Sequence, residues 1–107
     1  MDSWTHSFDL TGRTALVTGS SRGIGKAIAR ILGQAGAKVF VHGSRLSPAL
    51  DATVAEFRDI GIAAVGCHAD IADSAANRRL VEEVGQVDIL VLNASVQHKA
   101  KWPEIDA

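Results

Sequence analysis

The chain of 107 residues contains no tyrosine, only one cysteine and only two prolines. A single cysteine excludes an internal disulfide framework and a cysteine-rich zinc site, and it is typical of a reducing compartment. Basic residues number 11 and acidic residues 12, so no basic excess indicates binding to nucleic acid or to an acidic membrane surface. The longest apolar runs, such as 62–65 and 89–92, are far too short to span a bilayer.

What remains is the composition of one small soluble domain. Hydrophobic residues make up 47% of the chain and charged residues 21%, which argues against intrinsic disorder. The first eight residues are polar and lack a basic region before an apolar run, so they do not resemble a targeting segment. We therefore expect a cytoplasmic protein.

Short apolar blocks alternate with blocks of helical period. The apolar blocks predict strands at 14–18, 37–42, 62–68 and 87–92. Helices are expected between them, the second starting at Ser47-Pro48 and the third at Asp73 or Ser74, and each ends at a glycine. The predicted buried stripes are Ile24, Ala27, Ile28, Ile31, Leu32 and Ala35; Leu50, Val54, Phe57 and Ile60; and Ala76, Leu80, Val81 and Val84.

This alternation predicts an α/β fold with a doubly wound, Rossmann-type parallel sheet in the strand order 3-2-1-4. The last predicted strand, Ile89 to Leu92, would leave an unprotected apolar edge if nothing covered it. We therefore expect residues 1–107 to form a single partial dinucleotide-binding domain, truncated after the fourth strand.

A glycine-rich loop follows the first predicted strand and opens the first helix. Gly19 permits a sharp turn, Gly23 leaves room for a pyrophosphate, and Gly25 lets the helix pack close to the strand. The pattern of a phosphate-binding P-loop fails, because Ser20 and Ala27 occupy two of its four fixed positions. The loop thus predicts a dinucleotide site rather than a nucleoside-triphosphatase site.

The segment Thr18–Gly25 resembles the Thr-Gly-x-x-x-Gly-x-Gly loop of the short-chain dehydrogenase/reductase family at all four fixed positions. Asp70-Ile71, the run from Asp88 to Val91, and Asn93-Ala94 are also similar to family motifs, and the resemblance covers almost the whole chain. Leu92 and Ser95 depart from the family's Asn-Asn-Ala-Gly signature.

The resemblance implies that Asp70 holds the adenine amino group and that Asn93 lines the adenosine side. The cofactor-binding residues expected on these grounds are Gly19, Ser21, Arg22, Gly23, Ile24, Gly25, Ser44, Arg45, Asp70, Ile71, Asn93, Ala94 and Ser95.

The residues after the second strand favour NADP over NAD as the cofactor. No acidic residue occurs between Lys38 and Asp51, where NAD enzymes place a carboxylate on the ribose hydroxyl. Arg45 stands there instead, beside Ser44, and Arg22 is a second cation for a 2′-phosphate.

The resemblance also implies hydride transfer to or from a small carbonyl or alcohol substrate, with a catalytic Ser and a Tyr-x-x-x-Lys element, in a homo-oligomer. A chain without tyrosine cannot contain that element. The four histidines show no metal-ligand or triad spacing; His42 and His68, at strand ends, are expected to be structural or exposed. Cys67 is expected to be a small buried side chain.

Two hypotheses follow from these residues. The favoured one is the cofactor-binding part of an NADP-dependent short-chain oxidoreductase, inactive by itself. The alternative is a non-catalytic NADP-binding module that pairs with another chain. A metal site is not predicted, and the substrate is not indicated by the sequence.

Overall fold

The computed structural model describes residues 9–93, in which four strands alternate with three helices. The strands are β1 (Thr14–Val17), β2 (Lys38–Gly43), β3 (Ala64–His68) and β4 (Ile89–Val91). The helices are α2 (Gly23–Gln34), α3 (Pro48–Asp59) and α4 (Ser74–Val84). None of these described helices is long and apolar enough to cross a membrane.

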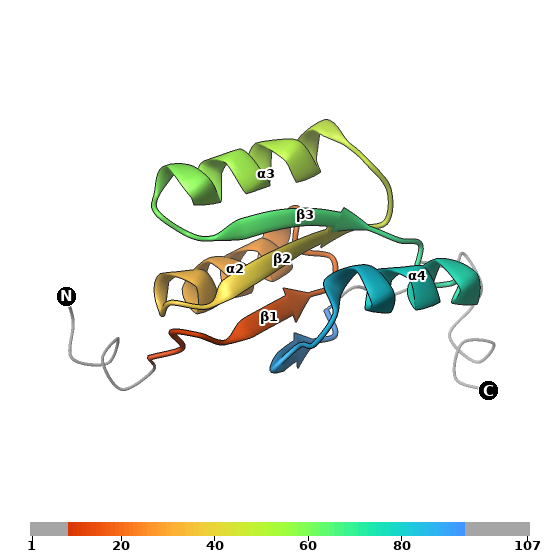
Figure 1. Cartoon of the computed structure of the whole chain (residues 1–107). Helices are drawn as coiled ribbons and strands as arrows, with labels where there is room; N and C mark the ends of the chain where they lie inside the picture. Colours follow the sequence, from red (N-terminus) through yellow and green to blue (C-terminus); the bar gives the residue numbers. More distant parts are fainter. Residues whose placement is uncertain (1–8, 94–107) are drawn as a thin grey trace, which may run out of the picture.

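The four strands form one parallel sheet in the order β3-β2-β1-β4 (Figure 1), which confirms the predicted Rossmann-type α/β fold. Ala15 in β1 pairs with Val39 on one side and with Ile89 on the other. After β3 the chain crosses by way of α4 to the opposite side of β1. The strand order therefore reverses at β1, and in open α/β sheets such a switch point is where ligands bind.

The helices cover both faces of the sheet. Ala15 and Val17 of β1 share one buried cluster with side chains of α2 and α3, whereas Leu16 belongs to a second cluster with side chains of α4. Figure 1 shows this arrangement, with α2 and α4 on opposite sides of the sheet. Because successive strand residues point to opposite faces, nearly continuous apolar strands are what a doubly covered sheet requires.

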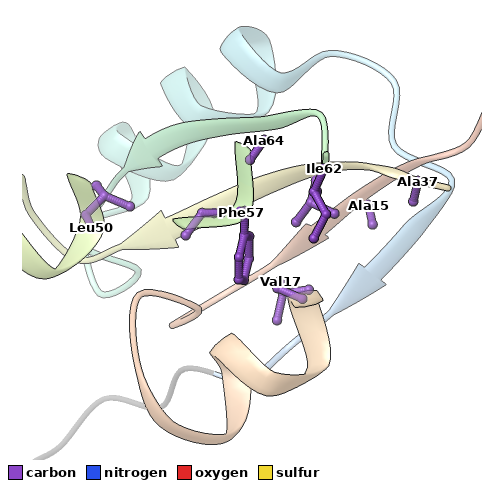
Figure 2. Close-up of a cluster of buried hydrophobic side chains, with 10 residues drawn as sticks. Ala15, Val17, Ala37, Leu50, Phe57, Ile62 and Ala64 are labelled. Atoms are coloured by element: carbon purple, nitrogen blue, oxygen red, sulfur yellow. The ribbon is translucent and has the colours of Figure 1, made fainter. Parts of the chain in front are cut away.

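Phe57 is the largest fully buried side chain of the described residues. It projects from α3 toward the strands, in the same cluster as Val17 and Ile62 (Figure 2). Leu50, near the start of α3, is buried in the same cluster. This cluster fixes α3 against the sheet beside α2.

The helix ends follow the expected chemistry. The Ser47 hydroxyl accepts a hydrogen bond from Leu50 N at 3.1 Å, with Pro48 in the first turn of α3. The Asp73 carboxylate accepts hydrogen bonds from Ala75 N and Ala76 N, so Asp73 rather than Ser74 is the N-cap of α4. The glycines predicted to follow the helices, at 36, 61 and 85, all have positive φ.

The predicted helix stripes are partly wrong. Ile24 in α2 is 74% exposed and Val81 in α4 is 66% exposed, and Ile31 and Ile60 are also exposed. The buried face of α2 consists instead of small residues, Gly25, Ala29 and Gly33. Small side chains let α2 approach the strands closely: a Cβ on Gly33 would lie 2.5 Å from Ile62 Cγ2. At that distance only a narrow stripe of the helix touches the sheet, so Ile24 and Ile31 face outward, while Ile28 is half-buried against the core.

Strand β4 lies at one end of the described sheet and is shorter than predicted, starting at residue 89 rather than 87. Its start is fixed on β1 by Asp88, whose carboxylate accepts a hydrogen bond from Thr14 N at 2.8 Å and whose own N–H donates to Thr14 O. Leu90 and Leu92 are 56% and 77% exposed. The apolar edge expected from the sequence is therefore present among residues 9–93.

Phe57→Ala tests the core that holds α3 in place. Removing a fully buried phenyl ring should lower the free energy of unfolding by about 3–5 kcal/mol, because apolar contacts are lost and a cavity remains. Urea unfolding followed by circular dichroism measures this change. The matched change Ile60→Ala, at the exposed end of the same helix, should cost less than about 1 kcal/mol. Equal losses would contradict the assigned packing of α3.

Candidate functional site

The loop between β1 and α2 lies where the strand order reverses. Gly19 and Gly23 both have φ of +64°, a left-handed conformation that residues with a Cβ rarely adopt. The chain therefore turns sharply as it leaves β1 and again as it enters α2. These two turns place the start of α2 at the carboxyl edge of the sheet.

Gly25 is the point of closest approach in this loop. A Cβ at Gly25 would lie 2.3 Å from Gly19 O and 2.6 Å from Asn93 Nδ2. Such separations do not occur between non-bonded atoms, and one of the obstructing atoms belongs to the backbone. Only glycine therefore fits at this position without a shift of the loop.

The N-terminus of α2 differs from those of the other described helices. Arg22 is its N-cap residue, and no side chain caps it, whereas Ser47 caps α3 and Asp73 caps α4. Its first turn also contains no acidic residue. The free N–H groups of the first turn and the positive end of the helix dipole therefore face neither a side-chain cap nor an acidic residue of that turn, which suits an anionic ligand.

His42 holds the loop from the end of β2. Its side chain is buried, with 1% exposure. Gly19 N donates to His42 Nδ1 at 3.0 Å, and His42 Nε2 lies 2.9 Å from Ala69 O. The backbone adds two more bonds, from His42 N to Ser20 Oγ and from Ser20 N to His42 O, both of 2.8 Å. The expected structural role of His42 is confirmed, and its place in the loop is now defined.

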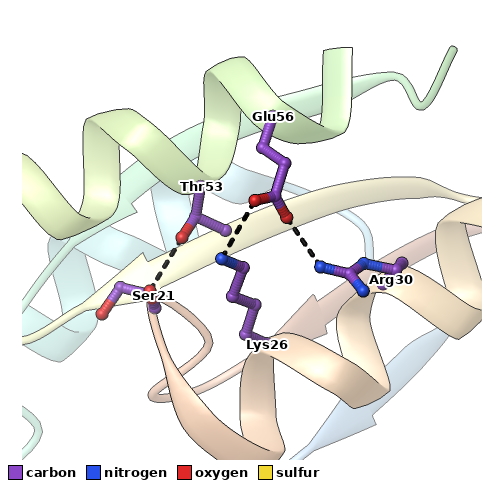
Figure 3. Close-up of polar contacts among 5 residues, drawn as sticks. All are labelled: Ser21, Lys26, Arg30, Thr53 and Glu56. Carbon is purple, nitrogen blue, oxygen red and sulfur yellow. Dashed lines mark hydrogen bonds and ion pairs between the residues drawn. The ribbon is translucent and has the colours of Figure 1, made fainter. Parts of the chain in front are cut away.

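Thr53 holds the loop from α3. Its buried hydroxyl donates to Ser21 O at 2.7 Å (Figure 3). One turn further along α3, the Glu56 carboxylate contacts Lys26 at 3.3 Å and Arg30 at 2.7 Å, both on α2. The hydrogen bonds from Arg30 and Lys26 hold the pKa of the Glu56 carboxyl below its usual value. This row of polar contacts ties α2 and its loop to α3.

The end of β4 supplies the third support. Thr18 Oγ1 accepts a hydrogen bond from Asn93 N at 2.9 Å and donates to Val91 O at 3.4 Å. The Asn93 side chain donates from Nδ2 to Gly19 O at 3.3 Å. Asn93, a predicted site residue, thus binds the first glycine of the loop directly.

The predicted residues on β2 and β3 lie at the same edge. Ser44 and Arg45 are exposed and follow β2 directly, and a Cβ at Gly43 would lie 3.8 Å from Ser21 Oγ. Ala69 N donates to Gly43 O at 3.1 Å, which brings Asp70 and Ile71 beside the end of β2.

Arg22 and Arg45 are both exposed, and neither forms an ion pair with another residue in the described range 9–93. Their guanidinium groups are thus available to a ligand. The predictions for Ala94 and Ser95 lie outside the described residues.

Three residues that hold the loop were not among the predicted site residues: Ser20, His42 and Thr53. The position of His42 was a usable signal, because the carboxyl end of a parallel strand lies beside the loop that follows the neighbouring strand. Thr53 carried no comparable signal, since its bond to Ser21 depends on how α3 is set against α2.

A nucleophilic or metal centre is not found in the part of the chain that the structure describes. Burial raises the pKa of the Cys67 thiol to about 12, so the thiol stays protonated at neutral pH. Its Sγ donates to Val41 O within the sheet. No group of three histidine, cysteine or acidic side chains in the described residues is placed to hold a metal ion. The groups that this edge does present are the uncapped start of α2 and the exposed Arg22 and Arg45, which suit an anionic ligand.

Comparison with known proteins agrees with this geometry. The family model of the short chain dehydrogenases matches residues 13–107. A 2-dehydro-3-deoxy-D-gluconate 5-dehydrogenase of Formosa agariphila is 42% identical over 103 residues, covering 92% of this chain and 39% of that protein.

Two solved structures are similar as well. A 3-oxoacyl (acyl-carrier-protein) reductase from Agrobacterium tumefaciens with NADP bound has a TM-score of 0.80 and 42% identity, covering 92% of this chain and 39% of its own. A gluconate 5-dehydrogenase from Burkholderia cenocepacia, in complex with NADP and tartrate, has a TM-score of 0.77 and 40% identity, covering 97% and 41%. The chain thus spans 39% to 41% of the length of these proteins.

Gly25→Ala tests the close approach of α2 to its loop. The added methyl group meets the Gly19 carbonyl, which cannot rotate away, so the free energy of unfolding should fall by about 1–3 kcal/mol. Gly33→Ala is the matched control, since both glycines are buried in α2 but Gly33 faces the side chain of Ile62. Urea unfolding of both variants should show the larger loss for Gly25→Ala. The reverse order would contradict the role assigned to Gly25.

Proposed function

This chain belongs to the short-chain dehydrogenase family, and we propose that residues 9–93 and the adjoining Ala94 and Ser95 form the cofactor-binding part of an NADP-dependent oxidoreductase. The observation that carries the proposal is the uncapped N-terminus of α2, packed at Gly25 against the loop that leaves β1. The family match and the NADP found in two similar structures support it.

The start of α2 fits the pyrophosphate of a dinucleotide. The backbone at Gly23 is open, since a Cβ there would meet nothing within 4 Å, although its φ of +64° still favours glycine. The phosphates would lie against the N–H groups of Gly23, Ile24 and Gly25, where the helix dipole stabilises negative charge. When bound, NADP supplies the hydride carrier that an oxidoreductase needs.

The end of β2 fits the 2′-phosphate that distinguishes NADP from NAD. Arg45 and Arg22 are exposed cations without an ion-pair partner in the described range, and Ser44, which stands between β2 and Arg45 in the sequence, adds a hydroxyl. An arginine binds a phosphate through two parallel hydrogen bonds. We therefore propose NADP as the cofactor and assign its 2′-phosphate to these three residues.

The residues after β3 and β4 complete the site. Asp70 and Ile71 lie beside the end of β2, on the side where the adenine of a dinucleotide bound at β1 would extend. The Asp70 carboxylate already accepts a hydrogen bond from Ala72 N at 2.9 Å through Oδ1. This bond orients the carboxylate, and its second oxygen, Oδ2, would accept from an amino group. Asn93, followed by Ala94 and Ser95, would line the adenosine side near Gly19.

For the whole protein we propose hydride transfer to or from a small carbonyl or alcohol substrate, in a cytoplasmic homo-oligomer. The catalytic Tyr-x-x-x-Lys element of the family is absent from these 107 residues, which contain no tyrosine. The similar proteins are longer than this chain, and the exposed edge at Leu90 and Leu92 is suited to a further strand. The same edge would suit a second polypeptide, which is the alternative of a non-catalytic NADP-binding module.

Arg45→Asp tests the assignment of NADP. The carboxylate removes a phosphate partner and repels the 2′-phosphate, so the preference for NADP⁺ over NAD⁺ should fall at least about tenfold. Isothermal titration calorimetry with both cofactors measures the ratio of the two Kd values. Arg79→Asp, an exposed arginine on α4, is the matched control and should leave the ratio unchanged. A ratio unaltered by Arg45→Asp would remove Arg45 from the site.

The second test is turnover by the 107-residue chain. It should bind NADPH but show no oxidation of NADPH above a blank with carbonyl substrates such as 3-ketoacyl thioesters or keto-sugar acids, because it has no tyrosine to act as acid and base. Absorbance of the reduced nicotinamide follows the reaction. Turnover dependent on the chain alone would contradict the division of roles proposed here.

A further inference from the structure

The hydrogen bonds of His42 determine which form of its imidazole the loop requires. Gly19 N–H donates to Nδ1, so Nδ1 must be the unprotonated nitrogen. Nε2 lies 2.9 Å from Ala69 O, an acceptor, so Nε2 must carry the proton. The neutral ring with its hydrogen on Nε2 satisfies both partners at once, and no other state of the ring does.

Protonation of the ring would place a hydrogen on Nδ1 that points at Gly19 N–H. Two donors would then face each other in a site with 1% exposure, where water cannot separate them. The bond to Ala69 O would survive, because Nε2 donates in both states. The cost of protonation therefore falls on the Gly19 side, at the first turn of the loop.

We propose that His42 is a positioning residue that holds the phosphate-binding loop in place only while its imidazole is neutral, so that affinity for NADP weakens in acid. This inference rests on the proposed NADP site, because it concerns the loop assigned to the pyrophosphate. His42 touches no cofactor atom in this scheme. It acts through Gly19 N, in the first turn of the loop, four residues before the Gly23 turn that leads into α2.

The surroundings of His42 favour the neutral ring at pH 7. Burial lowers the pKa of His42 below its ordinary value, the hydrogen bond to Ala69 O raises it in part, and the neighbouring charge of His68 lowers it. Since the pKa of His42 is lowered in the folded state, its contribution to stability is complete above about pH 6.5 and declines as the pH falls below it. The bond from Gly19 N is lost only as the pH falls through the lowered pKa of the folded state.

Few other titratable groups face the ring. From β3 these are His68 and Cys67, and Cys67 stays protonated because burial raises the pKa of its thiol to about 12. Asp70 follows Ala69 on the next loop. The glycine loop itself contributes no titratable side chain before Arg22.

The remaining supports of the loop limit the size of the effect. Ser20 keeps its two bonds to the His42 backbone in either charge state, and Thr53 keeps its bond to Ser21 O. Protonation should therefore displace Gly19 without releasing the whole loop. Loss of this one bond should weaken NADP⁺ binding by about threefold to tenfold.

The experiment compares the Kd for NADP⁺ of the full 107-residue chain at about pH 7.5 and at the lowest pH at which the chain remains folded, by calorimetry, in the wild type and three variants. His42→Asn offers an oxygen on the same branch as Nδ1 and cannot gain a proton. His42→Gln offers a donor placed like Nε2, and its carbonyl oxygen lies one carbon further from the backbone than Nδ1, so it is not placed to accept from Gly19 N. His68→Asn is the matched control, because His68 makes no hydrogen bond to the loop and its removal leaves the His42 imidazole able to gain a proton. The charge of His68 lowers the pKa of His42, so its loss should not reduce the fall in affinity.

In the wild type and in His68→Asn, the affinity for NADP⁺ should be weaker at the lower pH. This loss should be about threefold to tenfold larger than the loss in His42→Asn. The 2′-phosphate also titrates near pH 6, but it does so equally in every variant, and the difference between variants cancels it. His42→Gln should bind weakly at both pH values. An equal pH dependence in the wild type and His42→Asn would overturn the inference.

Nuclear magnetic resonance of the cofactor-free wild type supplies a test that needs no variant. The amide resonance of Gly19 should shift with the same midpoint as the imidazole resonances of His42, below the ordinary histidine pKa of about 6.5. A Gly19 amide that does not follow His42 would overturn the inference even if a variant fails to fold. Absence of NADP⁺ binding at both pH values, with the Gly19 amide still following His42, would instead overturn the proposed function. It would leave in place the dependence of the Gly19 bond on the charge of His42.

Discussion

The approach of α2 to the loop that precedes it is the constraint on which the candidate site depends. A Cβ at Gly25 would lie 2.3 Å from Gly19 O, so the helix can start where it does only with glycine at that position. This contact fixes the first turn of α2 at the carboxyl edge of the sheet, beside the point where the strand order reverses. An uncapped helix start is a disadvantage in a closed interior, but at this edge it leaves N–H groups free for an anionic ligand such as the proposed pyrophosphate.

The loop owes its shape to distant parts of the chain. Its supports are His42 at the end of β2, Thr53 in α3, and Asn93 after β4, which lie 22 to 75 residues from their partners in the sequence. The sheet register brings the first and third of these to the loop, and the packing of α3 on Phe57 brings the second. A change in the core of α3 is thus transmitted to Ser21, and loop geometry is a property of the whole fold.

The sequence was sufficient for features that depend on neighbouring residues. Ser47 and Asp73 marked helix starts because their side chains bond the next turn, and the glycine loop indicated the order of the strands. The sequence was insufficient for deciding which helix residues are buried, because that depends on the distance between the helices and the sheet. Ile24 and Val81 fit a helical stripe by spacing, yet both face outward, because the small residues of α2 and the narrow contact of α4 leave no room for them inside.

The same limit applies to the polar supports: the pairing of Thr53 with Ser21 is decided by how two helices lie against each other. By contrast, the placement of Arg45, Asp70 and Asn93 at one edge followed from the rule that parallel strands end together. Their positions could therefore be predicted from strand order alone, while their binding roles remain proposals.

The exposed edge of the sheet and the candidate site are physically connected. Asn93 binds Gly19 O and Thr18, but it can do so only while β4 stays paired with β1. That pairing involves three residues of β4, with Asp88 as an additional anchor, and Leu90 and Leu92 remain exposed to water. Burial of those leucines by a further strand or a second chain would stabilise β4 and hence the Asn93 support of the loop. Any strand that covers the edge of β4 is therefore coupled to the geometry of the proposed phosphate site through Ile89–Val91.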